Sequence, residues 1–457
     1  MKRDMTTGKV WKQILFFSLP IMAGNLLQQF YNTVDSIIVG QFVSENAFAG
    51  VSTCSALTFF YLGIAIGLSI GVGVVVSQYF GAGMHDELPM CIDTALILLG
   101  ACGLLITIIS LIITPFILRT FLSVPESVMP FALTYFQIYS LGFFFQFTYN
   151  SIAAILRGFG DSKAILVFLV IATVLNTILD IVFIVVFHWN VAGAAIATVA
   201  AQAVCVAVSY KYMRKRFPFI RSGRHWNRKI ALTMAKLGSP VAIQQCLVAV
   251  GQGAMQKLVN GFEDTVPGVI AAYGSAFRVD SFFYCLAQGF QSGLSGFTGQ
   301  NIGAGRLDRI KRGLITTQIM SISTAIVLSL LLYTFAGQVV SLFGLAGDSW
   351  LIGIEVIRFL SLFFWAFSCY VTFGGLLQGA GDTIILSVTT LSSLAIRIVT
   401  GYSAVYFGLL GYNAAWVTFP LGWVISIIIL GARYFTGGWK KKAVAGKLSR
   451  DSDLNSL

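Results

Sequence analysis

The sequence contains few charged residues, few histidines and no paired cysteines. Asp, Glu, Lys and Arg make up 11% of its 457 residues, whereas 57% are hydrophobic. Soluble globular proteins draw about a quarter of their residues from these four charged types. This composition excludes a water-soluble enzyme. The three histidines form no catalytic or metal-binding pattern that would indicate a membrane enzyme, so a non-enzymatic protein is expected.

The seven cysteines are scattered, mostly inside apolar segments, without a C-x-x-C pair. We interpret them as small buried hydrophobic residues rather than as metal ligands or disulfide partners. No cleavable signal peptide is predicted, because Lys9 and Lys12 lead directly into a full-length span.

Apolar segments of about 20 residues, the length that crosses a bilayer as a helix, fill most of the chain. A transmembrane β-barrel needs strands that alternate apolar and polar residues, but Leu96–Pro115 and Ile322–Phe335 are apolar on every side. The sequence therefore predicts an all-α integral membrane protein. Its twelve predicted transmembrane spans cover residues 14–40, 53–78, 92–115, 131–154, 164–187, 191–211, 231–256, 268–292, 314–337, 352–373, 384–407 and 411–432.

Lys and Arg cluster at the N-terminus, in alternate connections between the spans and in the C-terminal tail. Cytoplasmic loops carry this excess of positive charge, so both termini are predicted to be cytoplasmic. The same distribution explains the net charge of +12 without a nucleic-acid partner.

Short motifs of the first half recur in the second half at a nearly constant offset and in the same order. Gln78–Gly83 returns as Gln300–Gly305, and Leu156–Asp161 returns as Leu377–Asp382. Leu19-Pro20 also resembles Ser239-Pro240. The order predicts parallel repeats related by an axis along the membrane normal. We expect an N-terminal lobe of residues 1–217 and a C-terminal lobe of residues 218–457, joined by the basic loop near residues 211–229.

The glycine motifs lack the strand of a dinucleotide-binding fingerprint and the Gly-Lys-Ser/Thr of a phosphate-binding loop. We interpret them as tight cytoplasmic turns. In each copy a glycine takes a positive φ and the aspartate caps the next helix.

Ionisable residues within spans are costly and are candidates for function. In the first half, Asp35 belongs to a polar stripe on one helical face that also contains Gln28, Gln29 and Asn32. Asn176 and Asp180 are four residues apart and share a face, and Thr198 follows across a short turn. Their oxygens suit a hard monovalent cation, and the carboxylates can instead bind protons. A local polar network without an ion is the structural alternative.

In the second half, Arg278 and Asp280 are two residues apart and point to different sides of one helix. Asp280, Tyr284 and Gln288 share a face, and Gln252 and Gln256 share a face of the preceding helix. We expect these residues to line a substrate cavity of the second half, although a structural role fits equally well. Arg397 is a further ionisable residue within a span.

Taken together, these motifs resemble the MATE (multidrug and toxic compound extrusion) family of transporters. The resemblance covers nearly the whole chain and implies twelve helices in two pseudo-symmetric six-helix lobes. It implies alternating access and the export of organic cations and other amphipathic compounds, driven by H⁺ or Na⁺. It also implies a cell-membrane location, small-molecule drugs as the partners and no cofactor besides the coupling ion. We expect a monomer.

Within the family, a first-lobe cation site uses residues that correspond to Asp35, Asn176, Asp180 and Thr198. Asp35 and Asp180 would act as metal ligands only if the coupling ion is Na⁺. The seventh span lacks the carboxylate of another branch, and the tenth has only Glu355. This departure favours the DNA-damage-inducible (DinF-like) branch.

A multidrug antiporter is therefore the function that the sequence predicts. A lipid-linked oligosaccharide flippase of the same superfamily is the first alternative, although only Arg278 and Arg397 lie within the spans as cationic groups for a pyrophosphate. A channel or membrane-embedded receptor is the second.

Overall fold

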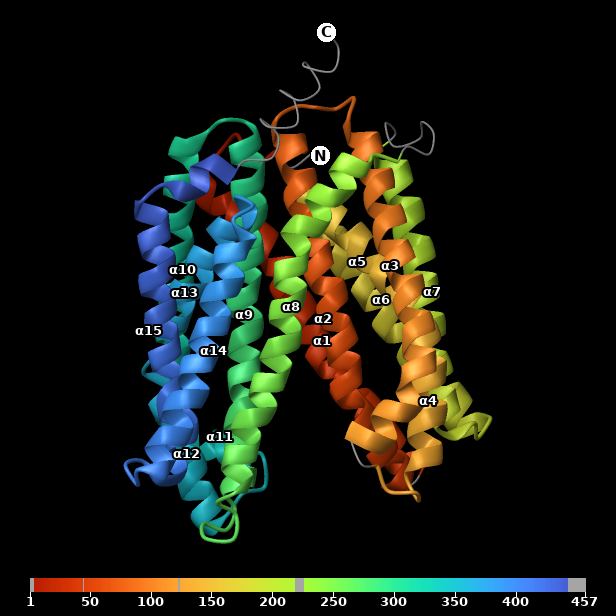
Figure 1. Cartoon of the computed structure of the whole chain (residues 1–457), viewed down its shortest axis with the longest axis vertical. Helices are drawn as coiled ribbons and strands as arrows, with labels where there is room; N and C mark the ends of the chain where they lie inside the picture. The colour runs from red at the N-terminus through yellow and green to blue at the C-terminus, as the bar shows by residue number, and fades with distance from the viewer. Residues whose placement is uncertain (1–3, 44, 122–123, 218–225, 443–457) are drawn as a thin grey trace. The chain divides into compact units, whose positions relative to one another are not determined.

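The computed structural model describes residues 4–43, 45–121, 124–217 and 226–442, with side chains described throughout these ranges except at residues 31–42, 45, 46, 48, 56 and 121. Part of the predicted joining loop, residues 218–225, lies outside the described residues. The described part of the chain is built from helices, most of which are long (Figure 1). The prediction of an all-helical fold is confirmed.

The chain divides into two compact units. Among the described residues, unit 1 comprises residue 4 and those between 19 and 246, and unit 2 comprises residues 5–18 and 247–442. Two helices contribute to both units: α1 (Val10–Phe42) divides after Ser18, and α8 (Arg228–Asn260) divides after Cys246. The prediction that two transport lobes meet at residue 217 concerns a different division, and it stays a prediction.

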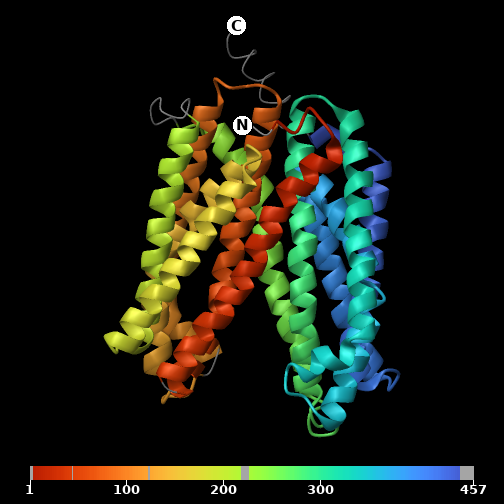
Figure 2. The same cartoon turned by 180° about the vertical axis from the view of Figure 1, so that it is seen from behind.

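Besides these shared helices, the described part of unit 1 consists of six α-helices and two short π-helical segments. They are α2 (Glu45–Gly81), α3 (Leu88–Phe116), η1 (Ile117–Phe121), α4 (Met129–Leu141), α5 (Phe143–Gly158), α6 (Ser162–Asp180), η2 (Ile181–Val186) and α7 (Asn190–Arg216). Figure 2 shows α6 and α7 side by side at the edge of this unit.

Within the described ranges, unit 2 contains seven α-helices of its own and two short 3₁₀ segments. They are α9 (Val269–Gly303), α10 (Leu307–Thr334), α11 (Ala336–Ser341), α12 (Gly347–Ser361), α13 (Phe364–Gly379), α14 (Thr383–Tyr406), η4 (Gly411–Asn413), α15 (Ala414–Phe435) and η5 (Gly438–Lys442). Its core includes Phe283 and Phe364, whose rings stack with centroids 4.1 Å apart.

All twelve predicted spans fall on these helices, and the spans 131–154 and 352–373 each fall on a pair of them, α4 with α5 and α12 with α13. Among the described residues, eight helices are long and apolar enough to cross a membrane. A ninth span results if α12 and α13, bent by 49° at their junction, are counted as one. Large apolar side chains face outward on these helices, for example Ile112 at 73% exposure and Val399 at 63%. Such surfaces require lipid rather than water.

The repeated glycine motifs form the predicted turns. Gly83 and Gly305 have φ angles of 73° and 71°, and Gly160 and Gly381 have φ angles of 77° and 84°. Residues with a Cβ rarely adopt this left-handed conformation, which explains glycine at each position.

The aspartates that follow two of these turns act differently. Asp161 accepts from the Ala164 N–H at 3.3 Å and from the Tyr212 hydroxyl at 2.7 Å, so it caps α6 as predicted. Asp382 makes no side-chain capping bond to α14, so the capping prediction is wrong for this copy. Instead, its buried carboxylate pairs with the Nε of Arg433 on α15 at 2.6 Å. A cation within reach offers Asp382 a stronger partner than a backbone N–H.

The second helix of each half packs through a glycine. Within unit 1, an added Cβ on Gly71 of α2 would lie 2.1 Å from the Met234 carbonyl oxygen and 2.8 Å from the Gly238 nitrogen of α8. Within unit 2, an added Cβ on Gly293 of α9 would lie 2.0 Å from the Ser18 Oγ of α1. Gly293 stands where Gly71 stands in the first repeat, and Gly238 stands where Ser18 does. The sequence repeat is therefore also a repeat of contacts.

The segment before α1 is bound within unit 2. Met5 is buried, and its N–H donates to Gln300 Oε1 at 2.9 Å while Asn301 Nδ2 donates to its carbonyl oxygen at 3.1 Å. The Arg309 guanidinium donates to the carbonyl oxygens of Met5, Thr7 and Gly8 at 3.1 to 3.2 Å. Gln300 and Asn301 belong to the repeated motif Gln300–Gly305, which therefore binds the segment before α1.

Candidate functional site

Three of the four residues predicted to bind the coupling cation lie together on α6 and α7. Asn176 and Asp180 are one turn apart on α6 and are 2% and 1% exposed. Asn176 Nδ2 donates to Thr198 Oγ1 on α7 at 3.4 Å. The Thr198 hydroxyl in turn donates to the Ala194 carbonyl oxygen at 3.0 Å, so its oxygen acts as the acceptor toward Asn176. The prediction that Thr198 lies at the depth of this pair agrees with the geometry.

The burial pattern of α6 is the reverse of that in a water-soluble helix. In its second half, the apolar Val174 and Ile178 are each 53% exposed, whereas the polar Asn176 and Asp180 are buried. A helix with its apolar face outward and its amide and carboxylate inward suits a lipid environment, where polar groups turn toward protein or a cavity.

Two irregularities follow Asp180 and fix where α7 begins. The helix changes from α to π at Ile181, and single π turns are frequent at functional sites. The turn after η2 then contains His188 and Asn190 with φ angles of 55° and 49°. Residues other than glycine seldom adopt positive φ, so packing around the turn must hold it. Trp189 stacks on Phe183 with ring centroids 5.0 Å apart, which provides such packing.

The side chains of Asp35 and Asn32 lie outside the described part of the structure, although both residues belong to α1. The participation of Asp35 in the cation site therefore stays a prediction. Gln28 and Gln29 precede them on α1; Gln28 is exposed and Gln29 is half-buried.

In unit 2, the predicted cavity residues do not form a single cluster. Gln288 Nε2 donates to the Tyr284 hydroxyl one turn earlier on α9. On α8, Gln256 Nε2 donates to Asn260 Oδ1 at 2.8 Å, and Gln252 is exposed.

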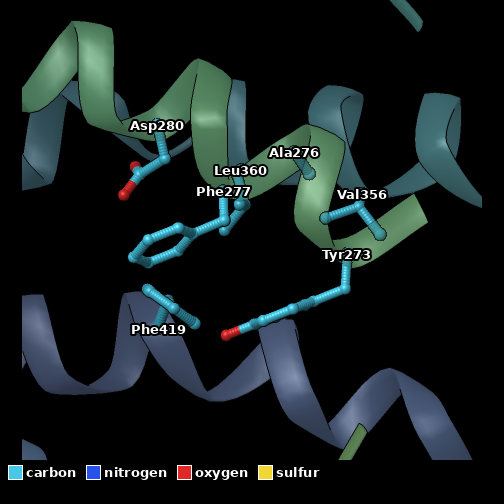
Figure 3. Close-up of a pocket in the computed structure, with 7 residues that line it drawn as sticks. All are labelled: Tyr273, Ala276, Phe277, Asp280, Val356, Leu360 and Phe419. Carbon is cyan, nitrogen blue, oxygen red and sulfur yellow. The ribbon is translucent and has the colours of Figure 1, made fainter. Parts of the chain in front are cut away.

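Arg278 and Asp280 face different spaces, as their spacing on the helix predicts. Arg278 lines a cavity of about 300 Å³ together with Gly274, Ser275 and residues of the segment that follows α11. Asp280 lines a much smaller cavity of about 10 Å³ with Tyr273, Phe277 and Phe419 (Figure 3). That volume holds about one water molecule.

Sequence reasoning missed the aromatic walls of the Asp280 cavity. Tyr273 and Phe277 come from the same helix as Asp280, so their one-turn spacing was a usable signal. Phe419 comes from α15 and Leu360 from α12, and only the packing of the helices brings them to this cavity. Arg397 also contacts Phe419, with its guanidinium carbon 3.4 Å from the ring centroid.

The described residues contain no group of three or more His, Cys, Asp or Glu side chains arranged to hold a metal ion. Of the seven cysteines, all free, Cys54, Cys91, Cys205 and Cys285 are buried as predicted, whereas the other three are half-buried.

Comparison with known families identifies the architecture. The sequence profile of the family designated MatE matches residues 20–182 and, a second time, residues 240–403. The chain belongs to the MATE family. The two matches begin at Pro20 and Pro240, which are the prolines of the repeated motif, and this agrees with the parallel repeat inferred from the short motifs.

Curated relatives of this MATE protein match three quarters or more of its length. The probable multidrug resistance protein YpnP of Bacillus subtilis is 28% identical over 96% of the chain and 97% of its own length. The probable multidrug resistance protein NorM of Thermotoga maritima is 22% identical over 95% and 94%. The FAD transporter of Shewanella oneidensis is 24% identical over 75% and 76%.

Solved structures agree with the fold. A MATE crystal structure in the straight conformation has a TM-score of 0.86 at 22% identity, covering 96% of this chain and 98% of that one. An outward-facing MATE structure of the MOP superfamily has the same TM-score at 21% identity, with coverages of 96% and 99%. The prediction of a MATE-type fold, with twelve transmembrane helices in two lobes, is confirmed. The chain is a multi-pass membrane transporter.

Proposed function

We propose that this MATE protein is a secondary active efflux antiporter. It exports organic cations and other amphipathic toxic compounds in exchange for H⁺ or Na⁺. The buried cluster of Asn176, Asp180 and Thr198 is the observation that carries the proposal, because it places a carboxylate, an amide and a hydroxyl inside a membrane-spanning pair of helices. The relatives named as multidrug resistance proteins support the drug-export part.

In this proposal, Asp35 completes the cation site with Asn176, Asp180 and Thr198. A bound cation neutralises the carboxylates, which lowers the cost of enclosing them away from water. The cation therefore favours the conformation in which the site is closed, and a ligand that binds one conformation better shifts the population toward it. Na⁺ would be ligated directly by Asp35 and Asp180, whereas H⁺ would titrate them.

The remaining parts of the proposal concern location and substrate path. The chain lies in the cytoplasmic membrane as a monomer with both termini in the cytoplasm, and it needs no cofactor besides the coupling ion. Two lobes, residues 1–217 and 218–457, provide alternating access to the two sides of the membrane. The protein belongs to the DNA-damage-inducible branch of the family. Substrates pass residues from both lobes: Gln28, Gln29, Asn32, Gln252, Gln256, Arg278, Asp280, Tyr284 and Gln288.

Ethidium efflux from proteoliposomes tests this function directly. The purified protein is reconstituted, and Na⁺ and proton gradients are imposed separately. Efflux driven by one gradient supports an antiporter and identifies the ion. Lipid flipping without ethidium movement would instead indicate a flippase, and conductive flux without saturation would indicate a channel.

Substitutions in the cluster test the residues. Asp35→Asn and Asp180→Asn should each abolish ion-driven efflux at normal expression, because an amide cannot carry the charge that the cation balances. Asp308→Asn is the matched control, since Asp308 is an exposed carboxylate in the first turn of α10. Normal coupling in both cluster variants would disprove the assigned site.

A further inference from the structure

The guanidinium of Arg397 occupies an enclosed place between α14 and α15. Its carbon lies 3.4 Å from the centroid of the Phe419 ring. A Cβ added to Gly422, one turn further along α15, would lie 2.9 Å from Arg397 Cδ and 3.1 Å from Cγ. The absence of a side chain at Gly422 therefore leaves room for the Arg397 stem to cross α15 and reach the ring.

The Arg397 Nε is buried and has no hydrogen-bond partner among the described residues. An arginine keeps its charge at any accessible pH, so it cannot escape this burial by losing a proton. Burial of one nitrogen of a charged group without a hydrogen-bond partner is costly, and charged groups in membrane spans usually mark a functional site.

Asp280 of α9 is a carboxylate whose charge interacts with this guanidinium. Phe419 contacts the Arg397 guanidinium and also lines the small cavity that Asp280 shares with Tyr273 and Phe277 (Figure 3). The charges of Asp280 and Arg397 interact, yet no ion pair within 4.0 Å joins them in the described part of the chain. The carboxylate thus lines the aromatic cavity, while the guanidinium of a different helix packs on Phe419, one of the residues that line it, and the two groups do not form an ion pair.

We propose that Asp280 and Arg397 form a charge-selective substrate site in unit 2. Asp280 binds the positively charged group of an amphipathic substrate against the rings of Tyr273 and Phe277. Arg397 is the internal counter-ion that balances Asp280 when the site is empty, and it competes with the substrate cation. This inference rests on the proposed function, and it assigns substrate selection to unit 2, with Arg397 as a specificity residue.

The chemistry of the cavity fits this role. Aromatic faces attract cations, and the attraction grows when water is excluded. An arginine already stacked on Phe419 shows that this wall accepts a cation. A substrate that brings its own positive charge must overcome repulsion from Arg397, so removal of the arginine should favour cations and disfavour anions.

The test compares three probes of different charge: ethidium, a monocation; Nile red, a neutral dye; and fluorescein, an anion. Binding to detergent-purified protein is measured by fluorescence anisotropy, and efflux is measured in proteoliposomes. The variants are Arg397→Gln, Asp280→Asn and their combination. Arg358→Gln is the matched control, because Arg358 also stacks on an aromatic ring of unit 2, that of Tyr333, at 5.3 Å but away from this cavity.

Arg397→Gln should tighten ethidium binding by about tenfold and weaken fluorescein binding, and Asp280→Asn should weaken ethidium binding by at least about tenfold. Nile red should bind all variants within about twofold of the wild type. The double variant should bind ethidium more weakly than Arg397→Gln does, and it should fold at least as well as either single variant, since it leaves no lone buried charge.

Equal losses for all three probes in both single variants, together with restored binding in the double variant, would show a purely structural pair and overturn the proposal. Unchanged ethidium binding in Asp280→Asn would also overturn it. Failure of the proposed function is a separate outcome: the wild type would then bind probes without gradient-driven efflux, and the anisotropy series would still decide the charge-selective site.

Discussion

Asp161 and Tyr212 in the first half occupy the same relative positions as Asp382 and Arg433 in the second, since 51 residues separate the partners in each pair. In both halves the aspartate follows a glycine turn and reaches the last part of the sixth helix of its half. The first pair joins a carboxylate to a neutral phenol, whereas the second joins it to a cation. The repeat therefore fixes the place of a contact but leaves its chemistry free.

The candidate sites differ in the same way. The first half buries Asn176, Asp180 and Thr198, which are oxygen and amide groups suited to a small cation. In the second half, Asp280 lines a small aromatic cavity and Arg397 stacks on Phe419, one of the residues that line it. Under the proposals made above, the first of these sites binds the coupling ion and the second binds a larger organic cation.

The largest difference in stability is expected between the Asp161–Tyr212 and Asp382–Arg433 pairs. Arg433→Gln should destabilise the protein by roughly 3 kcal/mol, because it leaves the buried Asp382 carboxylate without its cation. Tyr212→Phe should cost only about 1 kcal/mol, since Asp161 keeps its bond to the Ala164 N–H. Thermal unfolding of the detergent-purified variants measures both. Equal losses would mean that the two pairs are energetically equivalent.

A smaller difference in stability is expected between the helix contacts at Gly71 and Gly293. Gly71→Ala presses a methyl group onto backbone atoms of Met234 and Gly238, which cannot rotate away, so a loss of up to about 3 kcal/mol is expected. Gly293→Ala meets first the Ser18 hydroxyl, which can change rotamer, and should be tolerated better. Monodispersity and melting temperature measure both effects. The combination with Ser18→Ala should rescue Gly293→Ala, and a failed rescue would contradict this account.

Arg309→Lys tests a contact of unit 2 whose arginine has no counterpart in the first half, where Glu87 and Leu88 stand at the equivalent positions. The ammonium group cannot reproduce the forked contacts to Met5, Thr7 and Gly8, so a loss of roughly 1–2 kcal/mol is expected. Hydrogen exchange followed by mass spectrometry should show faster exchange at residues 5–8. Unchanged protection of residues 5–8 would show that the Arg309 contacts do not stabilise this segment.

Two glutamates near helix starts should show the smallest effects, and of opposite sign. Hydrogen bonds from the N–H groups of Ile270 and Gly268 lower the pKa of Glu263, whereas burial and the neighbouring Asp86 raise the pKa of Glu87. A lowered pKa in the folded state stabilises the protein above the usual carboxyl range, and this contribution is lost as pH falls through the folded value.

Glu263→Gln should therefore lower the melting temperature slightly at pH 7 and have no effect near pH 3. Glu87→Gln should raise it slightly at pH 7, because the folded state disfavours the charged form, and should also become neutral at low pH. Melting curves across this pH range measure both variants. Shifts of the same sign at pH 7 would disprove the contrast.

The sequence was sufficient to predict the elements of the fold that depend on local pattern. Apolar runs locate the helices, and glycines at a constant offset locate turns such as those at Gly160 and Gly381. The Asn176–Thr198 contact was also predictable, because only a short turn separates their helices. The Arg397–Phe419 contact also joins two helices separated by a short turn, but its close approach depends on the space that Gly422 leaves for the arginine stem, and no local pattern reveals that space. The hydrogen bonds of Met5 with Gln300, Asn301 and Arg309 join residues far apart in the chain, and no local pattern predicts them.

The hydrogen bond from the Met5 N–H to Gln300 joins residues that are 295 positions apart in the sequence, and this separation affects how the protein is assembled during synthesis. Met5 leaves the ribosome before its binding partners on α9 and α10, which follow it in the chain by 295 and 304 residues. The first helix must therefore wait in the membrane without its final neighbours, and unit 2 cannot be completed from the second half alone. Separately expressed halves would each lack a helix segment that only the other can supply.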